Sequence, residues 1–300
     1  MSQKLPATLQ ASSLTPRPTD LPRIGLCLGG GGARGLAHIL ILEVFDELDL
    51  RPSIITGTSI GALLGAAYAS GLSAAYIRSL TEETLTARFD FLSQLFSART
   101  PPLQKIFSVF PMRSALLDPS ALLDLILPQQ MAATFEELNI PTKIMATNLA
   151  AREPHIFDSG DLRRAMAASI AIPGLFSPVD VDNEPFVDGG IVDPLPYRIL
   201  HPDVDLVVAI DVSGGTRNVV EGPRPSMISV LTQSVLILQK TIIEERLQQS
   251  RPDLYIEVTL EKYGGLHFHK AQDILAEAAP IKAEFRDKLM RLLNSKPIEL

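Results

Sequence analysis

Two glycine-rich turns, each between a short apolar run and a helix-like segment, constrain the fold most strongly. The first turn, residues 29–35, reads GGGGARG and follows the apolar residues 24–28. The second turn, residues 57–61, reads GTSIG and follows another short apolar run. Residues 36–50 and 60–70 have the apolar spacing or the small-residue content of packed helices. Two strand–turn–helix units in succession predict an α/β fold.

The first turn has an unusually high conformational cost. Four consecutive glycines lose much backbone entropy on folding, so they are expected where the chain needs positive φ or where a ligand approaches the backbone closely. The segment also fits the dinucleotide-binding pattern G-x-G-x-x-G, which expects an acidic residue about twenty positions further on. The corresponding residues 54–59 contain none. Dinucleotide binding is therefore disfavoured.

Ser59 lies at the centre of the second turn. A sharp strand-to-helix turn leaves little room for side chains at Gly57 and Gly61 and projects the serine hydroxyl outward, as in a nucleophile elbow. The alternative is that Ser59 only caps the following helix, with its hydroxyl accepting a backbone N–H. The five residues 57–61 alone do not distinguish a nucleophile elbow from a helix cap.

A serine hydroxyl needs a neighbouring base to act as a nucleophile. Asp188 is the best candidate, because it ends a short apolar run and precedes Gly189 and Gly190, which permit a tight turn and leave the carboxylate approachable. The alternative is a simple Asp-Gly-Gly hairpin turn. The histidines carry no comparable signature; they are His38, His155, His201, His267 and His269.

The glycine loop, the serine turn and the Asp-Gly-Gly turn, in this order, resemble the patatin-like phospholipases. The resemblance runs from about residue 26 to residue 212 and includes ASIAIPGLF at 168–176 and GIVDPLP at 190–196. It implies a three-layer α/β/α fold with a mainly parallel central sheet. It also implies hydrolysis of lipid acyl esters by a Ser-Asp dyad without histidine.

The resemblance assigns roles to individual residues. Ser59 is the nucleophile and Asp188 the general base, and the oxyanion hole consists of the backbone N–H groups of Gly30, Gly31 and Gly32. An ordinary aspartate, with a pKa near 3.9, is a weak base at neutral pH. We therefore expect a partly dehydrated site that raises the pKa of Asp188.

Other motif positions have supporting roles by the same resemblance. Arg34 matches the basic position of the loop, where it either orients the loop or favours anionic head groups. Asp193 departs from the family, whose members often carry asparagine there, and adds a second carboxylate near the dyad. The supporting glycines are Gly35, Gly57, Gly61, Gly189 and Gly190.

The implied substrate is a phospholipid or a lysophospholipid, with no cofactor and no metal. The His267-Phe268-His269 segment offers only two metal ligands without an evident third. One alternative is a Ser-His-Asp carboxylesterase or thioesterase that uses His267 or His269, but that fold usually places several strands before the elbow. The other is a non-catalytic lipid-binding regulatory module, against which the intact serine, aspartate and glycines argue.

Composition and charge limit the kinds of molecule that the protein is expected to bind. A net charge of −7 argues against nucleic-acid binding and against strong adhesion to anionic membranes. Transient contact with a membrane surface is expected through apolar residues around the pocket. We see no signal peptide or transmembrane span and expect a cytoplasmic protein; delivery by an unstructured N-terminal secretion signal is the alternative. The single cysteine, Cys27, excludes an internal disulfide.

The expected domain organisation has three parts. Residues 1–20 form a disordered tail, residues 21–215 the patatin-like catalytic core, and residues 216–300 a helix–strand–helix segment that completes the same domain. Within the core, residues 81–130 form either a helical cap or helices that flank the sheet. The sequence does not constrain the oligomeric state. Further strands are expected at 143–147, 155–157, 206–212 and 254–258, and helices at 161–169, 226–249 and 271–293.

Overall fold

A central β-sheet organises the computed structural model, which describes residues 21–85, 117–214 and 227–295. Within these ranges the sheet has eight strands in the order β5-β6-β3-β2-β1-β7-β8, and β4 pairs with β3 off this path. The strands are β1 (Ile24–Leu28), β2 (Ile54–Thr58), β3 (Thr142–Asn148), β4 (Glu153–Phe157), β5 (Val179–Val181), β6 (Glu184–Asp188), β7 (Leu206–Asp211) and β8 (Leu254–Glu257).

The sheet is parallel at its centre and antiparallel at one end. Strands β3, β2, β1, β7 and β8 pair in parallel, as alternating strands and helices predict. Strands β4, β5 and β6 pair antiparallel. The expectation of a mainly parallel sheet thus holds for its middle, while the strand that ends in Asp188 belongs to the antiparallel part.

The helices follow the expected positions with two differences. They are α1 (His38–Glu47), α2 (Ile60–Ala69), α3 (Ala74–Leu80), α5 (Pro119–Ile126), α6 (Leu162–Ser169), α7 (Met227–Gln249), α8 (Ala271–Ala278) and α9 (Pro280–Ser295). The helix expected at 36–50 starts only at His38, because the glycine turn continues into a 3-10 helix, η1 (Gly32–Ala37). The helix expected at 271–293 is divided at Pro280, since proline cannot donate the hydrogen bond that would continue a helix.

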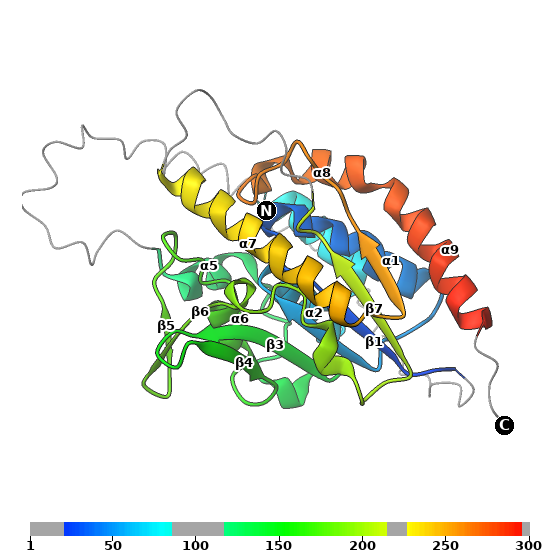
Figure 1. The fold of residues 1–300 in the computed structure, drawn as a ribbon, viewed down its shortest axis with the longest axis horizontal. Helices are drawn as coiled ribbons and strands as arrows, with labels where there is room; N and C mark the ends of the chain where they lie inside the picture. The colour runs from blue at the N-terminus through cyan, green and yellow to red at the C-terminus, as the bar shows by residue number, and fades with distance from the viewer. Residues whose placement is uncertain (1–20, 86–116, 215–226, 296–300) are drawn as a thin grey trace, which may run out of the picture.

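Two hydrophobic clusters lie on opposite faces of the sheet. Leu26 and Leu28 of β1 belong to the larger cluster, whereas Cys27 between them belongs to the smaller one, together with Ile243 of α7. Successive strand side chains point to opposite faces, so both faces are covered. Helix α7 crosses in front of the strands, and α1 and α2 lie behind them (Figure 1). The three-layer α/β/α architecture is therefore confirmed.

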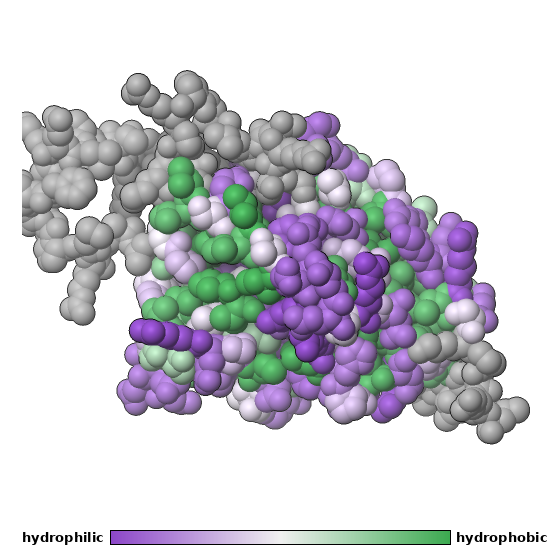
Figure 2. Space-filling view, in the orientation of Figure 1, coloured by the Kyte–Doolittle hydropathy of each residue, from purple (hydrophilic) through white to green (hydrophobic). Residues whose placement is uncertain are grey.

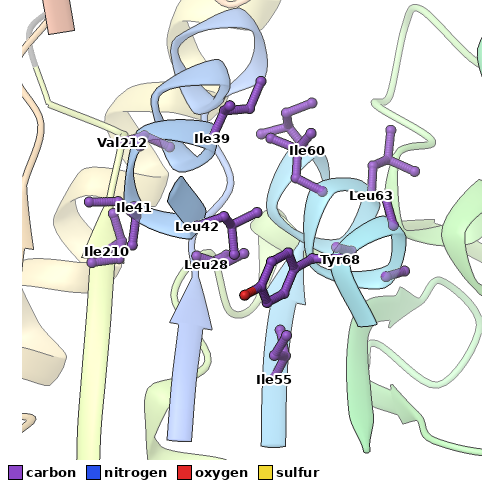
Figure 3. Close-up of a cluster of buried hydrophobic side chains, with 14 of the residues drawn as sticks. Leu28, Ile39, Ile41, Leu42, Ile55, Ile60, Leu63, Tyr68, Ile210 and Val212 are labelled. Carbon is purple, nitrogen blue, oxygen red and sulfur yellow. The ribbon is translucent and has the colours of Figure 1, made fainter. Parts of the chain in front are cut away.

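The larger cluster joins the two strand–turn–helix units. Figure 3 shows Leu42 of α1 and Tyr68 of α2 together above Leu28 of β1 and Ile55 of β2. All four side chains are nearly inaccessible to solvent. Burial of aliphatic and aromatic side chains on this scale is the main stabilising contribution to such a layer. It fixes the positions of both glycine turns at the same edge of the sheet.

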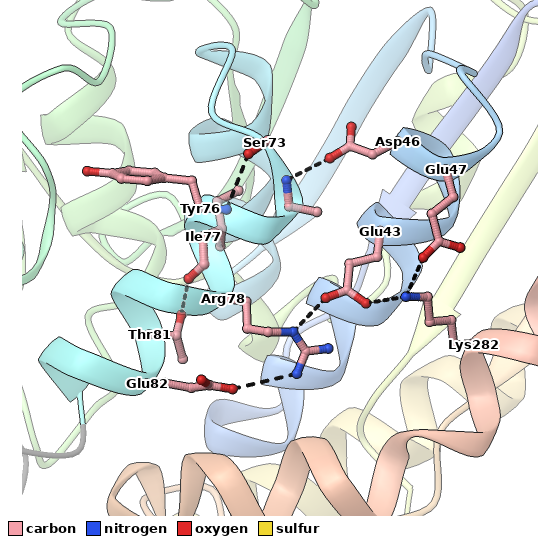
Figure 4. Close-up of polar contacts among 11 residues, drawn as sticks. Glu43, Asp46, Glu47, Ser73, Tyr76, Ile77, Arg78, Thr81, Glu82 and Lys282 are labelled. Atoms are coloured by element: carbon pink, nitrogen blue, oxygen red, sulfur yellow. Dashed lines mark hydrogen bonds and ion pairs between the residues drawn. The ribbon is translucent and has the colours of Figure 1, made fainter. Parts of the chain in front are cut away.

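A polar network joins three helices on the outside of this layer (Figure 4). The carboxylate of Glu43 in α1 accepts hydrogen bonds from Arg78 in α3 and from Lys282 in α9, and both bonds are 2.6 Å long. Partial burial opposes ionisation of Glu43, but the two cations hold its pKa below the usual value. Asp46, one turn further, accepts from the N–H of Ala74 at 2.8 Å. These contacts fix the N-terminal layer around α1.

Some sequence predictions fall outside the described residues. The tail at 1–20 and most of the segment at 81–130 do so; of the latter, the π-helix η2 (Thr81–Leu85) and α5 are described. The domain boundaries stay a prediction, although β8 pairs with β7 in the same sheet. Within the described ranges every helix is too short or too polar to serve as a transmembrane span.

Candidate active site

Ser59 stands in a strained turn between β2 and α2. Its backbone has φ 54° and ψ −122°, a conformation that residues with a side chain rarely adopt and that clusters at functional sites. A Cβ atom at Gly57 would lie 2.6 Å from the carbonyl carbon of Gly61, and one at Gly61 would lie 2.1 Å from the carbonyl oxygen of Leu28. Neither position has room for a side chain, as is expected for the residues that flank the serine of a nucleophile elbow.

The hydroxyl of Ser59 does not cap α2, since no capping hydrogen bond from its side chain is found. Its backbone N–H instead donates to Oγ of Ser169, at 2.9 Å. The Ser169 hydroxyl in turn donates to the carbonyl of Met145 in β3, at 2.7 Å, and is fully buried. Ser169 thus ties the elbow to the neighbouring strand and leaves the Ser59 hydroxyl uncommitted to the helix.

Strand β3 brings Asp188 to the elbow. Strand β4 pairs with residues 144–148 and occupies one edge of β3. Strand β2 pairs with residues 142–145 and β6 with residues 146–148, so both must lie along the other edge, one after the other. Thr58, the last residue of β2, is opposite Met145, and Asp188, the last residue of β6, is opposite Ala146. The ends of the two strands therefore meet at consecutive residues of β3.

The Asp-Gly-Gly segment is not a hairpin turn. The hairpin between β5 and β6 turns at Asp182 and Asn183, which have φ of 53° and 66°. Asp188 instead opens the 3-10 helix η6 (Gly189–Ile191), and its Oδ1 accepts from the N–H of Gly190 at 2.7 Å. The alternative interpretation of this motif therefore fails.

Burial makes the Asp188 carboxylate a stronger base than usual. Its side chain is buried, and burial raises its pKa to about 6, while the Gly190 N–H and the Ser59 hydroxyl act in the opposite direction. Oδ2 of Asp188 has no hydrogen-bond partner among the described residues. The carboxylate is thus dehydrated, as the sequence led us to expect.

Of the three glycines expected to form the oxyanion hole, two lie at the cavity that contains Ser59. Gly31 and Gly32 line one cavity together with Ser59 and Asp188. The N–H of Gly30, however, donates to the carbonyl of Pro194 at 2.9 Å. Gly30 therefore does not fit the expected oxyanion role, because its only donor is already engaged with the segment that follows Asp188.

Arg34 supports the loop from within the protein. Its side chain is fully buried, donating from Nε to the carbonyl of Gly31 at 3.4 Å and from Nη1 to that of Gly214 at 3.2 Å. Burial lowers its pKa to about 10, so it stays cationic at neutral pH. Of the two expected roles, orientation of the loop fits; contact with a head group does not, since the guanidinium is inaccessible.

The loop packs closely against the elbow. A Cβ atom at Gly35 would lie 2.2 Å from Cγ2 of Ile60, the residue after the serine. His38 donates from Nε2 to the carbonyl of Gly29 at 2.9 Å, and burial lowers its pKa to about 4. His38 is therefore a neutral side chain that holds the start of the loop.

Helix α7 covers the other side of the Asp188 turn. A Cβ atom at Gly189 would lie 2.3 Å from the carbonyl oxygen of Met145, and one at Gly190 would lie 2.1 Å from Nε2 of Gln239 in α7. Gln239 is buried and lines the cavity with Ser59 and Asp188. Neither Gln239 nor Ser169 was assigned a role from the sequence. A single buried polar residue in a helix, such as Gln239, has no local signature, and the family-like stretch 168–176 that contains Ser169 does not show what its hydroxyl contacts.

Asp193 does not act as a second free carboxylate. It forms an ion pair with Arg246 of α7, whose guanidinium also donates to the carbonyl of Val192 at 2.9 Å. Burial raises the pKa of Asp193, and Arg246 opposes this shift. The charge introduced by this departure from the family pattern is therefore offset by α7.

A second, mostly apolar cavity also reaches Ser59. Aliphatic and aromatic side chains from four parts of the chain surround it. They are Ile60 and Leu63 of α2, Leu122 and Ile126 of α5, Ile170, Ile172, Leu175 and Phe176 after α6, and Leu266 and Phe268 before α8. Ser59 thus lies where a cavity with Asp188 meets one suited to a hydrocarbon chain.

The remaining histidines do not complete a triad in the described structure. His267 and His269 line neither cavity, and Nδ1 of His267 accepts from the N–H of Gly264 at 3.1 Å. Among the described residues, no group of three or more His, Cys, Asp or Glu side chains is placed to hold a metal ion.

The fold and the site define a three-layer α/β protein with a serine elbow opposite a buried carboxylate. The sequence profile of the patatin-like phospholipase family matches residues 26–201. The chain belongs to this family, as its three ordered motifs predict.

Curated relatives extend well beyond the matched region. An NTE family protein of Mycobacterium tuberculosis is 33% identical over 72% of this chain and 56% of its own length. Lysophospholipase NTE1 of Coccidioides immitis is 25% identical over 96% of this chain and 20% of its own length. The chain therefore spans about half the length of the first relative and a fifth of the second. Among solved structures, VipD from Legionella pneumophila has a TM-score of 0.46 and 14% identity, over 89% of this chain and 67% of that chain.

Proposed function

We propose that this protein is a serine acyl hydrolase that cleaves carboxylic ester bonds of phospholipids or lysophospholipids. The observation that carries the proposal is the meeting of Ser59, on a strained elbow, with Asp188, a buried carboxylate whose pKa is raised to about 6. A carboxylate with such a pKa is ionised at neutral pH and is a better proton acceptor than an ordinary aspartate.

In the proposed mechanism, Ser59 attacks the ester carbonyl as Asp188 takes its proton. The N–H groups of Gly31 and Gly32 stabilise the oxyanion, an effect of about 3 kcal/mol for each donor. Asp188 then gives the proton to the leaving alcohol, which leaves an acyl group on Ser59. Water removes this acyl group by the same route in reverse.

The apolar cavity supports a lipid acyl chain as the substrate. None of the described residues that line it is charged, so a hydrocarbon chain beside them desolvates no ion. Membership of the patatin-like phospholipases and the names of the NTE1 relatives, lysophospholipases, point to the same class of ester. Thioesters and simple carboxylesters would use the same chemistry.

Transient contact with a lipid surface is part of the proposal. Helix α7 exposes Val230, Leu231, Ile237 and Leu238 on one stripe, while Leu236 and Gln239 on its other side line the site. Figure 2 shows hydrophobic residues over the first half of α7 and hydrophilic ones over the second half. No charged residue occurs from 227 to 239. Such a stripe suits a neutral lipid surface more than an anionic one.

The two alternatives have less support. A Ser-His-Asp esterase needs a histidine at Ser59, and His267 and His269 line neither cavity. A lipid-binding module without activity does not account for the strained serine and the dehydrated carboxylate. Independence of cofactors and metals and a cytoplasmic location stay predictions.

The test is the release of free fatty acid from a panel of phospholipids, lysophospholipids and simple esters, with Ser59→Ala as the blank. Release by the wild type alone, unchanged by excess chelator, is the expected result. The absence of release above the blank, from protein shown to be folded, would contradict the proposal. A chelator-sensitive activity that calcium restores would contradict its metal independence.

A further inference from the structure

Gln239 places an unsatisfied polar atom at the candidate site. Its side chain is only 5% exposed, and Oε1 has no hydrogen-bond partner among the described residues. Buried polar atoms are almost always bonded to protein or to ordered water. Gln239 lines the cavity that contains Ser59 and Asp188, so a molecule bound in this cavity is the expected hydrogen-bond partner of its carbonyl oxygen.

A second unsatisfied acceptor lines the same cavity. Oδ2 of Asp188 is buried and has no hydrogen-bond partner among the described residues. An ionised carboxylate and an amide carbonyl oxygen both accept hydrogen bonds and cannot donate to each other. A molecule that satisfies both must bring two donors, and water is the smallest molecule that does.

The position of Gln239 is fixed by contacts of α7 with the segment after Asp188. Arg246, two turns further along α7, pairs with Asp193 and donates to the carbonyl of Val192 at 2.9 Å. A Cβ atom at Gly190 would lie 2.1 Å from Nε2 of Gln239 and 2.9 Å from Oδ1 of Asp188. The amide and the carboxylate therefore pack on the same glycine.

We propose that Gln239 positions the water molecule that releases the acyl group from Ser59. This inference rests on the proposed acyl-enzyme. The water gives one proton to Oδ2 of Asp188, while its second O–H donates to Oε1 of Gln239. The water oxygen forms a bond to the acyl carbon, the bond from that carbon to Oγ of Ser59 breaks, and Asp188 returns the proton to Oγ. The product is the free fatty acid.

An alcohol that attacks the same acyl-enzyme has different needs. Methanol carries a single O–H, whose proton goes to Asp188, and it has no second O–H to donate a hydrogen bond to Gln239. Gln239 therefore assists hydrolysis but not transfer of the acyl group to an alcohol. The ratio of these two products reports the role of Gln239 directly.

The experiment uses a p-nitrophenyl acyl ester in buffer that contains methanol. Wild type, Gln239→Met and the matched control Gln233→Met are compared, with Ser59→Ala as the blank; Gln233 is also on α7 but lines neither cavity. In Gln239→Met we expect the ratio of methyl ester to free acid to rise about tenfold, the effect of one lost hydrogen bond in a transition state. The initial burst of p-nitrophenol is retained, and Gln233→Met keeps the wild-type ratio.

The product ratio does not depend on how much of a variant is folded. An unchanged ratio in Gln239→Met would overturn the water-positioning role even if total activity falls. A wild type that releases neither free acid nor methyl ester above the Ser59→Ala blank would overturn the proposed function and this inference with it.

Discussion

Ser59 and Asp188 reach the same point of β3 from opposite directions. Strand β2 runs parallel to β3 and ends opposite Met145, whereas β6 runs antiparallel and ends opposite Ala146. The two side chains thus follow strand ends that face each other along a single edge. The backbone hydrogen bonds of the sheet hold both strand ends in place, which is the precise placement that the proposed dyad needs for proton transfer.

The first prediction concerns the pH dependence of hydrolysis. Asp188 accepts a proton only when it is ionised, and burial raises its pKa to about 6. The value of kcat/KM on a soluble short-chain ester should therefore be constant above pH 7 and fall about tenfold per pH unit well below 6. A profile that is flat down to pH 5 would contradict the assigned base.

The second prediction concerns stability. The folded-state pKa of Asp188, about 6, lies above the usual value of 3.8 for an aspartate, so the ionised carboxylate destabilises the fold at neutral pH. Asp188→Asn should raise the free energy of unfolding at pH 8 by about 1–3 kcal/mol. The gain should shrink between pH 6 and pH 4, where the wild-type carboxylate becomes protonated. Denaturant unfolding at pH 8 and pH 4.5 measures both values; equal or lower stability of the variant at pH 8 would count against a dehydrated carboxylate.

The third prediction concerns Ser169 as a positioning residue. Ser169→Ala removes the link between the Ser59 N–H and the Met145 carbonyl. We expect kcat to fall about tenfold with little change in KM. Ser70→Ala is the matched control, because Ser70 also accepts from a backbone N–H and donates to a carbonyl, away from both cavities. If the two variants lose kcat equally, Ser169 has only a structural role.

Local steric needs explain what the sequence could predict. At Gly57 and Gly61, atoms within 3 Å would clash with any side chain, so the two glycines are a local sign of the elbow. The five residues alone did not exclude a helix cap, and the neighbouring strand, helix and glycine loop supplied the context. The parallel centre of the sheet follows from alternating strands and helices. The proximity of Asp188 to Ser59 was predicted only through the family resemblance. It arises because a third segment, β3, pairs with both of the strands that carry these residues.

Long-range contacts explain what the sequence could not predict. Gly30 was expected to bind the oxyanion, but its N–H is engaged by Pro194, far along the chain. Ser169 and Gln239 both make contacts with distant segments. Ser169 lies in the family-like stretch 168–176, which assigned it no role, and Gln239 lies in no pattern that distinguishes it from an ordinary helical residue. The division of the last helix at Pro280 was readable from the sequence and was missed.

The most direct test of the dyad compares Asp188→Asn with a variant that replaces His267 and His269 together by alanine. Fatty acid release is measured from the best substrate of the panel, with Ser59→Ala as the blank. The dyad predicts that Asp188→Asn loses at least about a hundredfold in kcat, while the double histidine variant stays near the wild-type value. An active Asp188→Asn beside an inactive double histidine variant would contradict the account.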